Sequence, residues 1–270
     1  MDQTRTVGEQ TIADFGEQWL RFPTHEGFYV SQDLLRDICE PLLPIEQFRG
    51  ARVAEIGSGT GRIVEMILDA GAAQVTALEP SAAYDVLRQN LARHGARVSY
   101  IRATGDQLPA EGQFDIVVSI GVLHHIPSPA SAVAAAYRAL RPGGRMLIWL
   151  YGHEGNGAYL GAVTPLRWLT TRLPAAPTEW LARALNVAAG LYIGGCKVMP
   201  LPLRGYMMHV FGKFTPERRV QVIYDQLKPA YAKYYKQREA IDLLATAGFT
   251  DVQIHHRHGY SWTVLGVKST

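Results

Sequence analysis

The chain has 270 residues, a formal net charge of +3 and a charged fraction of 19%, values typical of an ordinary globular protein. Its basic residues are scattered, so no nucleic-acid partner is expected. No apolar run is long enough for a signal peptide or a membrane span, and we expect a cytoplasmic protein. Cys39 and Cys196 have neither metal-ligand nor redox spacing, so we expect free thiols and no metal site.

The first 50 residues are predicted to be helical and are rich in aromatic side chains. Phe15, Trp19 and Phe22 recur at helical spacing, and an apolar helical pattern follows between residues 34 and 42. Two prolines end that pattern. The sequence therefore predicts an N-terminal helical cap over residues 1–50.

From residue 51 onward, short apolar segments alternate with helical patterns. Seven segments are predicted as strands: 52–56, 74–78, 98–101, 114–119, 145–151, 252–256 and 262–267. The helical patterns between them cover residues 63–70, 82–94, 131–140 and 239–247. This alternation predicts an α/β fold with a doubly wound, mostly parallel seven-stranded sheet covered on both faces. The last two strands are close enough in sequence to form a hairpin.

The alternation stops between residues 152 and 237. This stretch holds many prolines and several short helical patterns but no strand pattern, which predicts a large, mainly helical insertion. The core then comprises residues 51–151 and 238–270. Long excursions at the carboxyl edge of such a sheet carry substrate contacts, so we expect the insertion to form a lid. Its apolar segment at 185–193 also allows peripheral contact with a membrane.

The segment AEIGSGTGR, residues 54–62, is called the glycine loop below. It follows a predicted strand and opens a helix, so its backbone can approach a ligand at the carboxyl edge of the sheet. The dinucleotide fingerprint G-x-G-x-x-G is not met, because Arg62 stands where its last glycine belongs. Glu55, two residues before the first glycine, disfavours a pyrophosphate and favours an ammonium or sulfonium group.

Glu79 ends the second predicted strand, twenty residues after Gly59. At that separation an acidic side chain accepts hydrogen bonds from both hydroxyls of a ribose. The two carboxylates together predict a ligand with an adenosine-type ribose and a positive charge but no phosphate.

These motifs make the chain resemble the class I S-adenosylmethionine-dependent methyltransferases. The resemblance covers residues 52–151 and resumes from 239 to the end. It rests on EIGSGTG, the ribose carboxylate, the FDIVVS strand, LHH and RPGG, which occur in the family's order. A member of this family has the Rossmann-like fold described above.

The resemblance implies S-adenosylmethionine as the cofactor and S-adenosylhomocysteine as the product. ATGDQLP, residues 103–109, resembles the adenine-binding turn, although Thr104 stands where many members carry aspartate and Asp106 is the nearest acid. The cofactor contacts implied are Glu55, Gly57, Ser58, Gly59, Gly61, Glu79, Pro80, Thr104, Gly105, Asp106 and Ser119.

His124 and His125 lie in SIGVLHHIPSP, residues 119–129, which resembles the family's loop beside the transferring methyl group. Either histidine can pack within the loop or act as a base near the acceptor. Adjacent residues on a turn point in different directions, so only one is expected to face the substrate. By family position we favour His124.

Acceptor contacts are expected from two further places. Arg257, His258 and Tyr260, near the C-terminus, can extend over the sheet edge. Tyr206 and His209, in the insertion, can line an acceptor pocket or form the core of the lid. His256 and His258 share one face of the predicted strand, but no third ligand is evident, so we predict no metal site there.

The sequence therefore predicts a methyltransferase that acts on a small molecule by direct transfer to oxygen or nitrogen. The acceptor classes considered are a sugar, a natural product and a lipid-linked intermediate. One alternative is an RNA or protein methyltransferase, but strand four ends in SIGV rather than Asn/Asp-Pro-Pro-Tyr. Another is a catalytically inactive protein that binds S-adenosylmethionine. The oligomeric state is left open.

Overall fold

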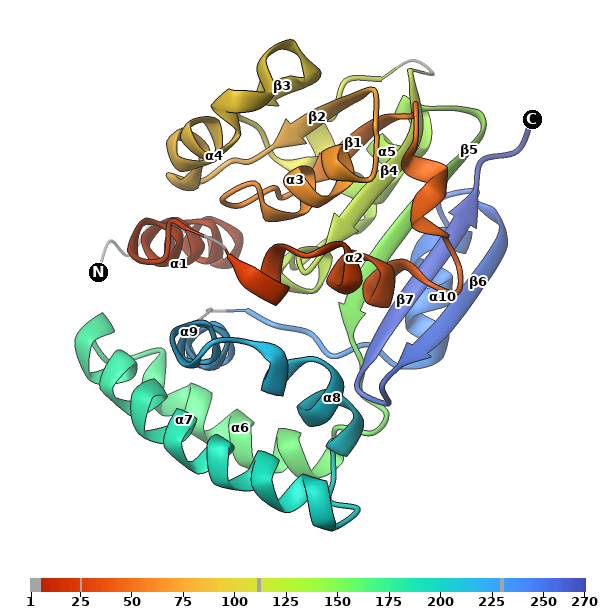
Figure 1. Cartoon of the computed structure of the whole chain (residues 1–270). Helices are drawn as coiled ribbons and strands as arrows, with labels where there is room; N and C mark the ends of the chain where they lie inside the picture. The colour runs from red at the N-terminus through yellow and green to blue at the C-terminus, as the bar shows by residue number, and fades with distance from the viewer. Residues whose placement is uncertain (1–5, 25, 111–112, 229–230) are drawn as a thin grey trace.

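The computed structural model describes residues 6–24, 26–110, 113–228 and 231–270. Its centre is a seven-stranded sheet in the order β3-β2-β1-β4-β5-β7-β6 (Figure 1). The strands are β1 (Arg52–Ile56), β2 (Gln74–Leu78), β3 (Val98–Ile101), β4 (Phe114–Ile120), β5 (Leu140–Tyr151), β6 (Thr250–Arg257) and β7 (Ser261–Val267). The first five run parallel, and β7 runs antiparallel to both β5 and β6. The predicted doubly wound, mostly parallel sheet is confirmed.

Helices cover both faces of the sheet and extend beyond its carboxyl edge. The helices outside the insertion are α1 (Val7–Arg21), α2 (Gln32–Cys39), α3 (Arg62–Asp69), α4 (Ala83–Leu91), α5 (Ala130–Ala139) and α10 (Gln237–Ala245). The insertion holds α6 (Gly157–Thr170), α7 (Ala175–Val198), α8 (Arg204–His209) and α9 (Pro216–Leu227). Short 3-10 helices are η1 (Gly27–Val30), η2 (Ile45–Phe48), η3 (Ala92–Arg97), η4 (Gly105–Gln107), η5 (Leu123–His125) and η6 (Phe211–Lys213).

The core divides into two clusters because successive strand residues point to opposite faces. Val53 of β1 belongs to the cluster beneath α2, α3 and α4, whereas its neighbour Ala54 belongs to the cluster beneath α5 and α10. The strand β4 is buried along nearly its whole length, as its FDIVVSI sequence predicts for a central parallel strand. None of the described helices is long and apolar enough to cross a bilayer.

Helix ends follow local capping chemistry. Thr6 and Glu9 form a capping box that starts α1, and the Ser31 hydroxyl accepts the Leu34 amide at the start of α2. Thr215 caps α9 in the same way, with Pro216 in the first turn.

The segment between α5 and β5 differs from the expectation. RPGG was predicted to be a turn before a strand at 145, but β5 already begins at Leu140. Leu140 pairs with Phe114, and the Gly143 amide and Gly144 carbonyl bond to Lys268. These partners lie in β4 and in the C-terminal segment, so a local reading of the sequence missed them.

The glycine loop crosses very close to the loop that follows β4. Gly57 has a φ of 78°, and a Cβ built there would lie 2.5 Å from Cγ2 of Val122. Gly61 has a φ of 94°, and a Cβ there would lie 2.9 Å from Leu87 and Leu91 of α4. A side chain at either position would push apart elements that the site needs in contact.

Replacing Gly57 by alanine should therefore destabilise the fold through two effects. Left-handed backbone costs about 1–2 kcal/mol for a residue with a Cβ, and the clash adds about 1–3 kcal/mol. Gly143→Ala is the matched control, because Gly143 has a φ of 73° but nothing within 4 Å of the added Cβ. Urea unfolding should show the larger loss for Gly57→Ala, and equal losses would contradict the close approach.

Candidate active site

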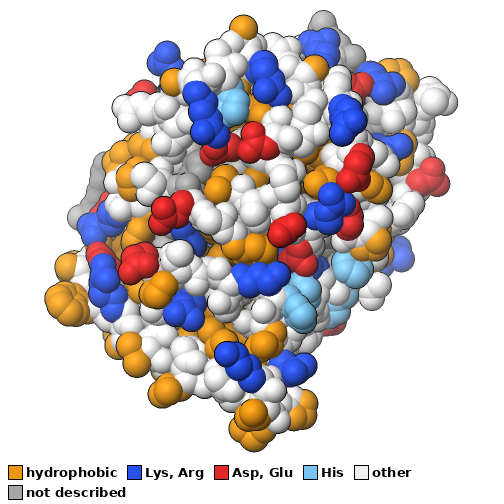
Figure 2. Space-filling view, in the orientation of Figure 1, with side chains coloured by type: hydrophobic (Ala, Val, Ile, Leu, Met, Phe, Trp, Pro, Cys, Tyr) orange, Lys and Arg blue, Asp and Glu red, His pale blue; other side chains and the backbone are white. Residues whose placement is uncertain are grey.

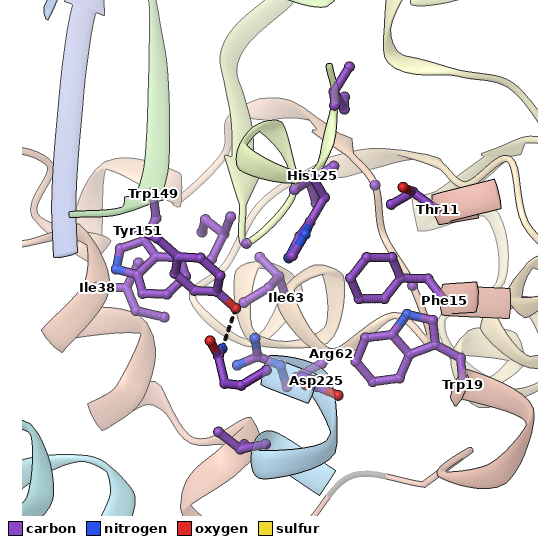
Figure 3. A pocket seen from close by; sticks show the side chains of 18 of the residues that line it. Thr11, Phe15, Trp19, Ile38, Arg62, Ile63, His125, Trp149, Tyr151 and Asp225 are labelled. Carbon is purple, nitrogen blue, oxygen red and sulfur yellow. Dashed lines mark hydrogen bonds between the residues drawn. The ribbon is translucent and has the colours of Figure 1, made fainter. Parts of the chain in front are cut away.

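A cavity of about 830 Å³ lies between the carboxyl edge of the sheet, helix α1 and the insertion. Its walls come from the glycine loop, the loop after β4, α1 and helices α6 to α9. Figure 3 shows aromatic side chains from α1 on one side and from β5 on the other, with His125 between them. This volume is in the range of ligand sites and has room for more than one small molecule.

Glu55 lies at the cavity wall with a carboxylate oxygen that has no partner. Only 1% of the residue is exposed, and its Oε2 makes no hydrogen bond to any described residue. Burial raises the pKa of Glu55 to about 8, against the opposing effects of Ser58 and Arg62. With this pKa, Glu55 is mostly a neutral acid near pH 7, and a cationic hydrogen-bond donor from a ligand would favour its ionised form.

Glu79 ties the glycine loop to the end of β2. One carboxylate oxygen accepts the Gly59 amide at 2.7 Å, and the other accepts the Ser81 amide at 2.9 Å. Trp19 of α1 lies against the same loop, since a Cβ at Gly59 would be 3.3 Å from its indole ring. The loop is therefore held from below by Glu79 and covered from above by α1.

Most of the predicted cofactor residues line this cavity. Those that do are Glu55, Gly57, Ser58, Gly59, Glu79, Pro80, Thr104, Gly105 and Asp106. Gly61 and Ser119 are not among the lining residues, and their contacts with the cofactor stay predictions. Gly61 instead allows α3 to pack on α4, and the Ser119 hydroxyl donates to the Ile56 carbonyl at 3.3 Å.

His125 is the histidine that faces the cavity (Figure 3). Its Nδ1 lies 2.8 Å from the carbonyl oxygen of Tyr231. A carbonyl only accepts, so Nδ1 carries the proton and Nε2 keeps a free lone pair. Burial lowers the pKa of His125 to about 4, so the ring is neutral near pH 7.

His124 does not face the cavity, although the sequence interpretation favoured it. Its side chain is fully buried, and its ring packs 3.8 Å from that of Tyr151, centroid to centroid. Neither ring nitrogen has a hydrogen-bond partner of good geometry in the described part of the chain. On the short helix η5, consecutive side chains diverge, and the structure turns His125 inward.

The predicted acceptor residues divide between two locations. Tyr206, Arg257 and Tyr260 line the cavity. His258 instead lies beside Asp37, with its Nε2 2.7 Å from that carboxylate, and His209 stacks on the outer side of His258. Neither histidine is among the cavity residues, and their contact with an acceptor stays a prediction.

Arg257 is buried and committed to protein contacts. Its guanidinium pairs with Asp37 and donates to the Tyr260 hydroxyl. It therefore orients Tyr260 at the cavity wall rather than offering a free cation.

A polar network in the insertion was not predicted from the sequence. Gln226 of α9 donates to the Tyr151 hydroxyl at 2.6 Å, the contact dashed in Figure 3. Its amide oxygen accepts from Tyr159 at 2.9 Å and from Tyr234 at 3.0 Å. Burial raises the pKa of Tyr151, which keeps its hydroxyl protonated and able to donate into the cavity.

Asp225 of α9 joins the insertion to both the cap and the core. Gln18 of α1 donates to its carboxylate, and in Figure 3 Arg62 of α3 lies nearby. Burial raises the pKa of Asp225 to about 7, although Arg218 and Arg62 act against this. Three elements distant in sequence therefore meet at one carboxylate.

Comparisons with known proteins show which proteins the chain is similar to. Residues 54–148 match the family described as "Methyltransferase domain". A ubiquinone biosynthesis O-methyltransferase from Aromatoleum aromaticum is 36% identical over 135 residues, covering 49% of this chain and 57% of that protein. The corresponding enzyme from Roseobacter denitrificans is 30% identical over 156 residues, covering 56% and 61%. The matches thus span about three fifths of the relatives' length.

A solved structure shows the same fold over the full chain. The 1,6-didemethyltoxoflavin-N1-methyltransferase of Burkholderia thailandensis superposes with a TM-score of 0.51 at 17% identity, covering 100% of this chain and 94% of that one. Residues 54–148 therefore match a methyltransferase domain, the class of protein that the motifs predicted, and the solved structure has the same α/β fold.

Asp225 should make stability depend on pH. Its folded pKa of about 7 lies above its ordinary value of 3.8, so its stabilising protonation is complete below about pH 4 and lost as the pH rises through about 7. Asp225→Asn cannot ionise. Its melting temperature should therefore rise relative to wild type between pH 5 and pH 8.

Asp85→Asn, at an exposed position on α4, is the control and should follow the wild type at both pH values. If the melting temperatures of Asp225→Asn and wild type change in parallel with pH, Asp225 is already ionised at low pH and this interpretation is wrong.

Proposed function

We propose that this protein transfers a methyl group from S-adenosylmethionine to an oxygen or nitrogen atom of a small, largely apolar aromatic acceptor. The observation that carries this proposal is one cavity that joins the glycine loop, His125 and an aromatic wall. The names of the relatives, which specify O-methylation in ubiquinone biosynthesis and N1-methylation of 1,6-didemethyltoxoflavin, support a small-molecule acceptor.

The residues present fit S-adenosylmethionine. The unpartnered oxygen of Glu55 is suited to the ammonium group, and the glycine loop lets the backbone approach the ligand. Glu79 lies where an acid accepts ribose hydroxyls, and the turn at Thr104 and Gly105 continues the wall toward the base. Bound there, the cofactor supplies a methyl group on a positively charged sulfur, which becomes the neutral thioether of S-adenosylhomocysteine.

His125 is the group suited to removing the acceptor's proton. Its Nε2 lone pair is free because the Tyr231 carbonyl holds the proton on Nδ1. As the new carbon–oxygen or carbon–nitrogen bond forms, the acceptor's proton passes to Nε2 and later to solvent. Alignment of the acceptor in a dry cavity supplies more of the rate than this base does.

The cavity wall favours an aromatic acceptor over an unsubstituted sugar. Trp149, Tyr151, Tyr206 and Tyr260 present ring faces and edges, while the polar contacts converge on Gln226. Such a wall stacks on a flat ring and fixes its orientation with few hydrogen bonds. Because helices of residues 152–237 form much of this wall, we propose that the insertion acts as the lid and selects the acceptor.

The proposed function is tested by following a labelled methyl group. Purified protein with methyl-labelled S-adenosylmethionine should transfer label to phenols or nitrogen heterocycles in a cell extract's small-molecule fraction. Glu79→Ala is the control and should weaken cofactor binding by about 2–4 kcal/mol, since it removes both the charged acceptor for the ribose hydroxyls and the support of the glycine loop. Label found only in RNA or protein, or no cofactor binding by calorimetry, would overturn the proposal.

The role of His125 is tested by His125→Asn. The asparagine amide can still donate to the Tyr231 carbonyl, but nothing replaces Nε2. We expect kcat to fall by about 10²–10⁴, with cofactor affinity unchanged. In the wild type, kcat/KM should stay level down to about pH 5 and fall as the pH approaches about 4, where the ring becomes protonated.

His124→Asn separates a base from a packing residue. Because His124 is buried against Tyr151, this variant should lower the melting temperature and affect binding and turnover together. If His125→Asn keeps its rate while His124→Asn loses only turnover, the assignment of the base is reversed.

A further inference from the structure

The outer side of α7 exposes a row of large apolar side chains. Trp180, Val187, Leu191 and Val198 are 74%, 69%, 78% and 81% exposed. Their spacing of seven, four and seven residues places them on one face of the helix. Such a row is uncommon on a water-facing helix and marks a surface that contacts something else.

A further exposed tryptophan lies close in sequence to the connection between α6 and α7. Trp168, near the end of α6, is 64% exposed, and its ring packs against the Arg172 guanidinium at 4.1 Å. Figure 2 shows apolar side chains gathered along the lower margin, where Figure 1 places α7. We call Trp168, Trp180, Val187, Leu191 and Val198 the outer face.

The same part of the chain has a positive net charge. Residues 155–216 hold six basic side chains (Arg167, Arg172, Arg183, Lys197, Arg204 and Lys213) and one acid, Glu179, for a net charge of +5. The whole chain carries +3, so the remaining residues sum to −2. Arg172, Arg183, Lys197 and Arg204 are exposed.

The inner side of the same helices is apolar as well. Leu185 and Ala189 of α7, Val163 and Leu166 of α6, and Met207 of α8 line the cavity. A lid that only closes a cavity needs one apolar face. The second apolar face therefore requires a separate explanation.

We propose that the outer face binds the surface of an anionic lipid bilayer. Tryptophans settle at the boundary between headgroups and acyl chains, and Lys and Arg pair with anionic headgroups. A second copy of this chain is a poorer partner, because its outer face would bring like charges together. The proposal concerns binding to the membrane and stands whether or not the proposed acceptor is correct.

Vesicle sedimentation tests the proposal directly. Full-length protein is mixed with phosphatidylcholine vesicles, or with vesicles that also contain about 30% phosphatidylglycerol. We expect the wild type to sediment with the anionic vesicles and much less with the neutral ones. Added salt should reduce the binding, because the headgroup attraction is screened.

Two variants separate the apolar and charged contributions. Trp180→Ser should lower the partition coefficient about tenfold or more on anionic vesicles. Lys197→Gln should lower it about fivefold on anionic vesicles and leave the neutral ones unchanged. Both side chains are exposed, so melting temperatures should match the wild type.

Matched substitutions elsewhere are the controls. Val7→Ser removes a 52% exposed side chain from α1, and Arg238→Gln removes an exposed charge from α10, away from α7 in Figure 1. Both should bind vesicles like the wild type. The proposal is overturned if the wild type does not sediment with anionic vesicles, or if Trp180→Ser binds as well as the controls. Analytical ultracentrifugation that shows a dimer broken by Trp180→Ser, without vesicle binding, would assign the face to a second copy.

Discussion

The carboxylate of Glu79 fixes the geometry on which the site depends. It accepts amides from Gly59 and Ser81, so one side chain sets both the path of the glycine loop and the exit of β2. The loop needs this support, because its glycines adopt left-handed conformations that gain nothing from side-chain packing. With the loop held in place, Gly57 can pass close to Val122, and the loop after β4 is positioned in turn. The position of His125 thus follows from contacts made two strands away.

The second constraint is that the cavity residues are buried away from water. This burial shifts the pKa values of the ionisable groups around the cavity. Removing water disfavours every charged form, so burial raises the pKa values of Glu55 and Asp225 and lowers that of His125. These shifted pKa values suit the proposed reaction, in which the sulfur of the cofactor loses its positive charge and the acceptor loses a proton. A neutral histidine can accept a proton, and a buried acid such as Glu55 ionises when a cationic group of a ligand pairs with it.

The strands and the glycine loop of the sheet domain were predictable from the sequence, because their signals are local. The glycine spacing, the position of Glu79 and the strand–helix rhythm each lie within one or two neighbouring elements. The choice between His124 and His125 was not predictable, because it depends on how η5 turns against Tyr151 and Tyr231. The contacts of Gln226 and Asp225 had no local signal either. Gln18 and Asp225 lie 207 positions apart and meet only after the insertion folds back over α1.

The insertion combines this enclosure with an unusual surface. Its helices are apolar toward the cavity and also on the outer face, so apolar burial alone does not determine which way they pack. Orientation therefore depends on a few polar contacts at the inner side. Gln226 with its three tyrosines and Asp225 with Gln18 supply them, since each is satisfied only when α9 faces the core. These buried polar contacts therefore fix the orientation in which the insertion packs on the core. In that orientation the apolar row of α7 faces away from the cavity.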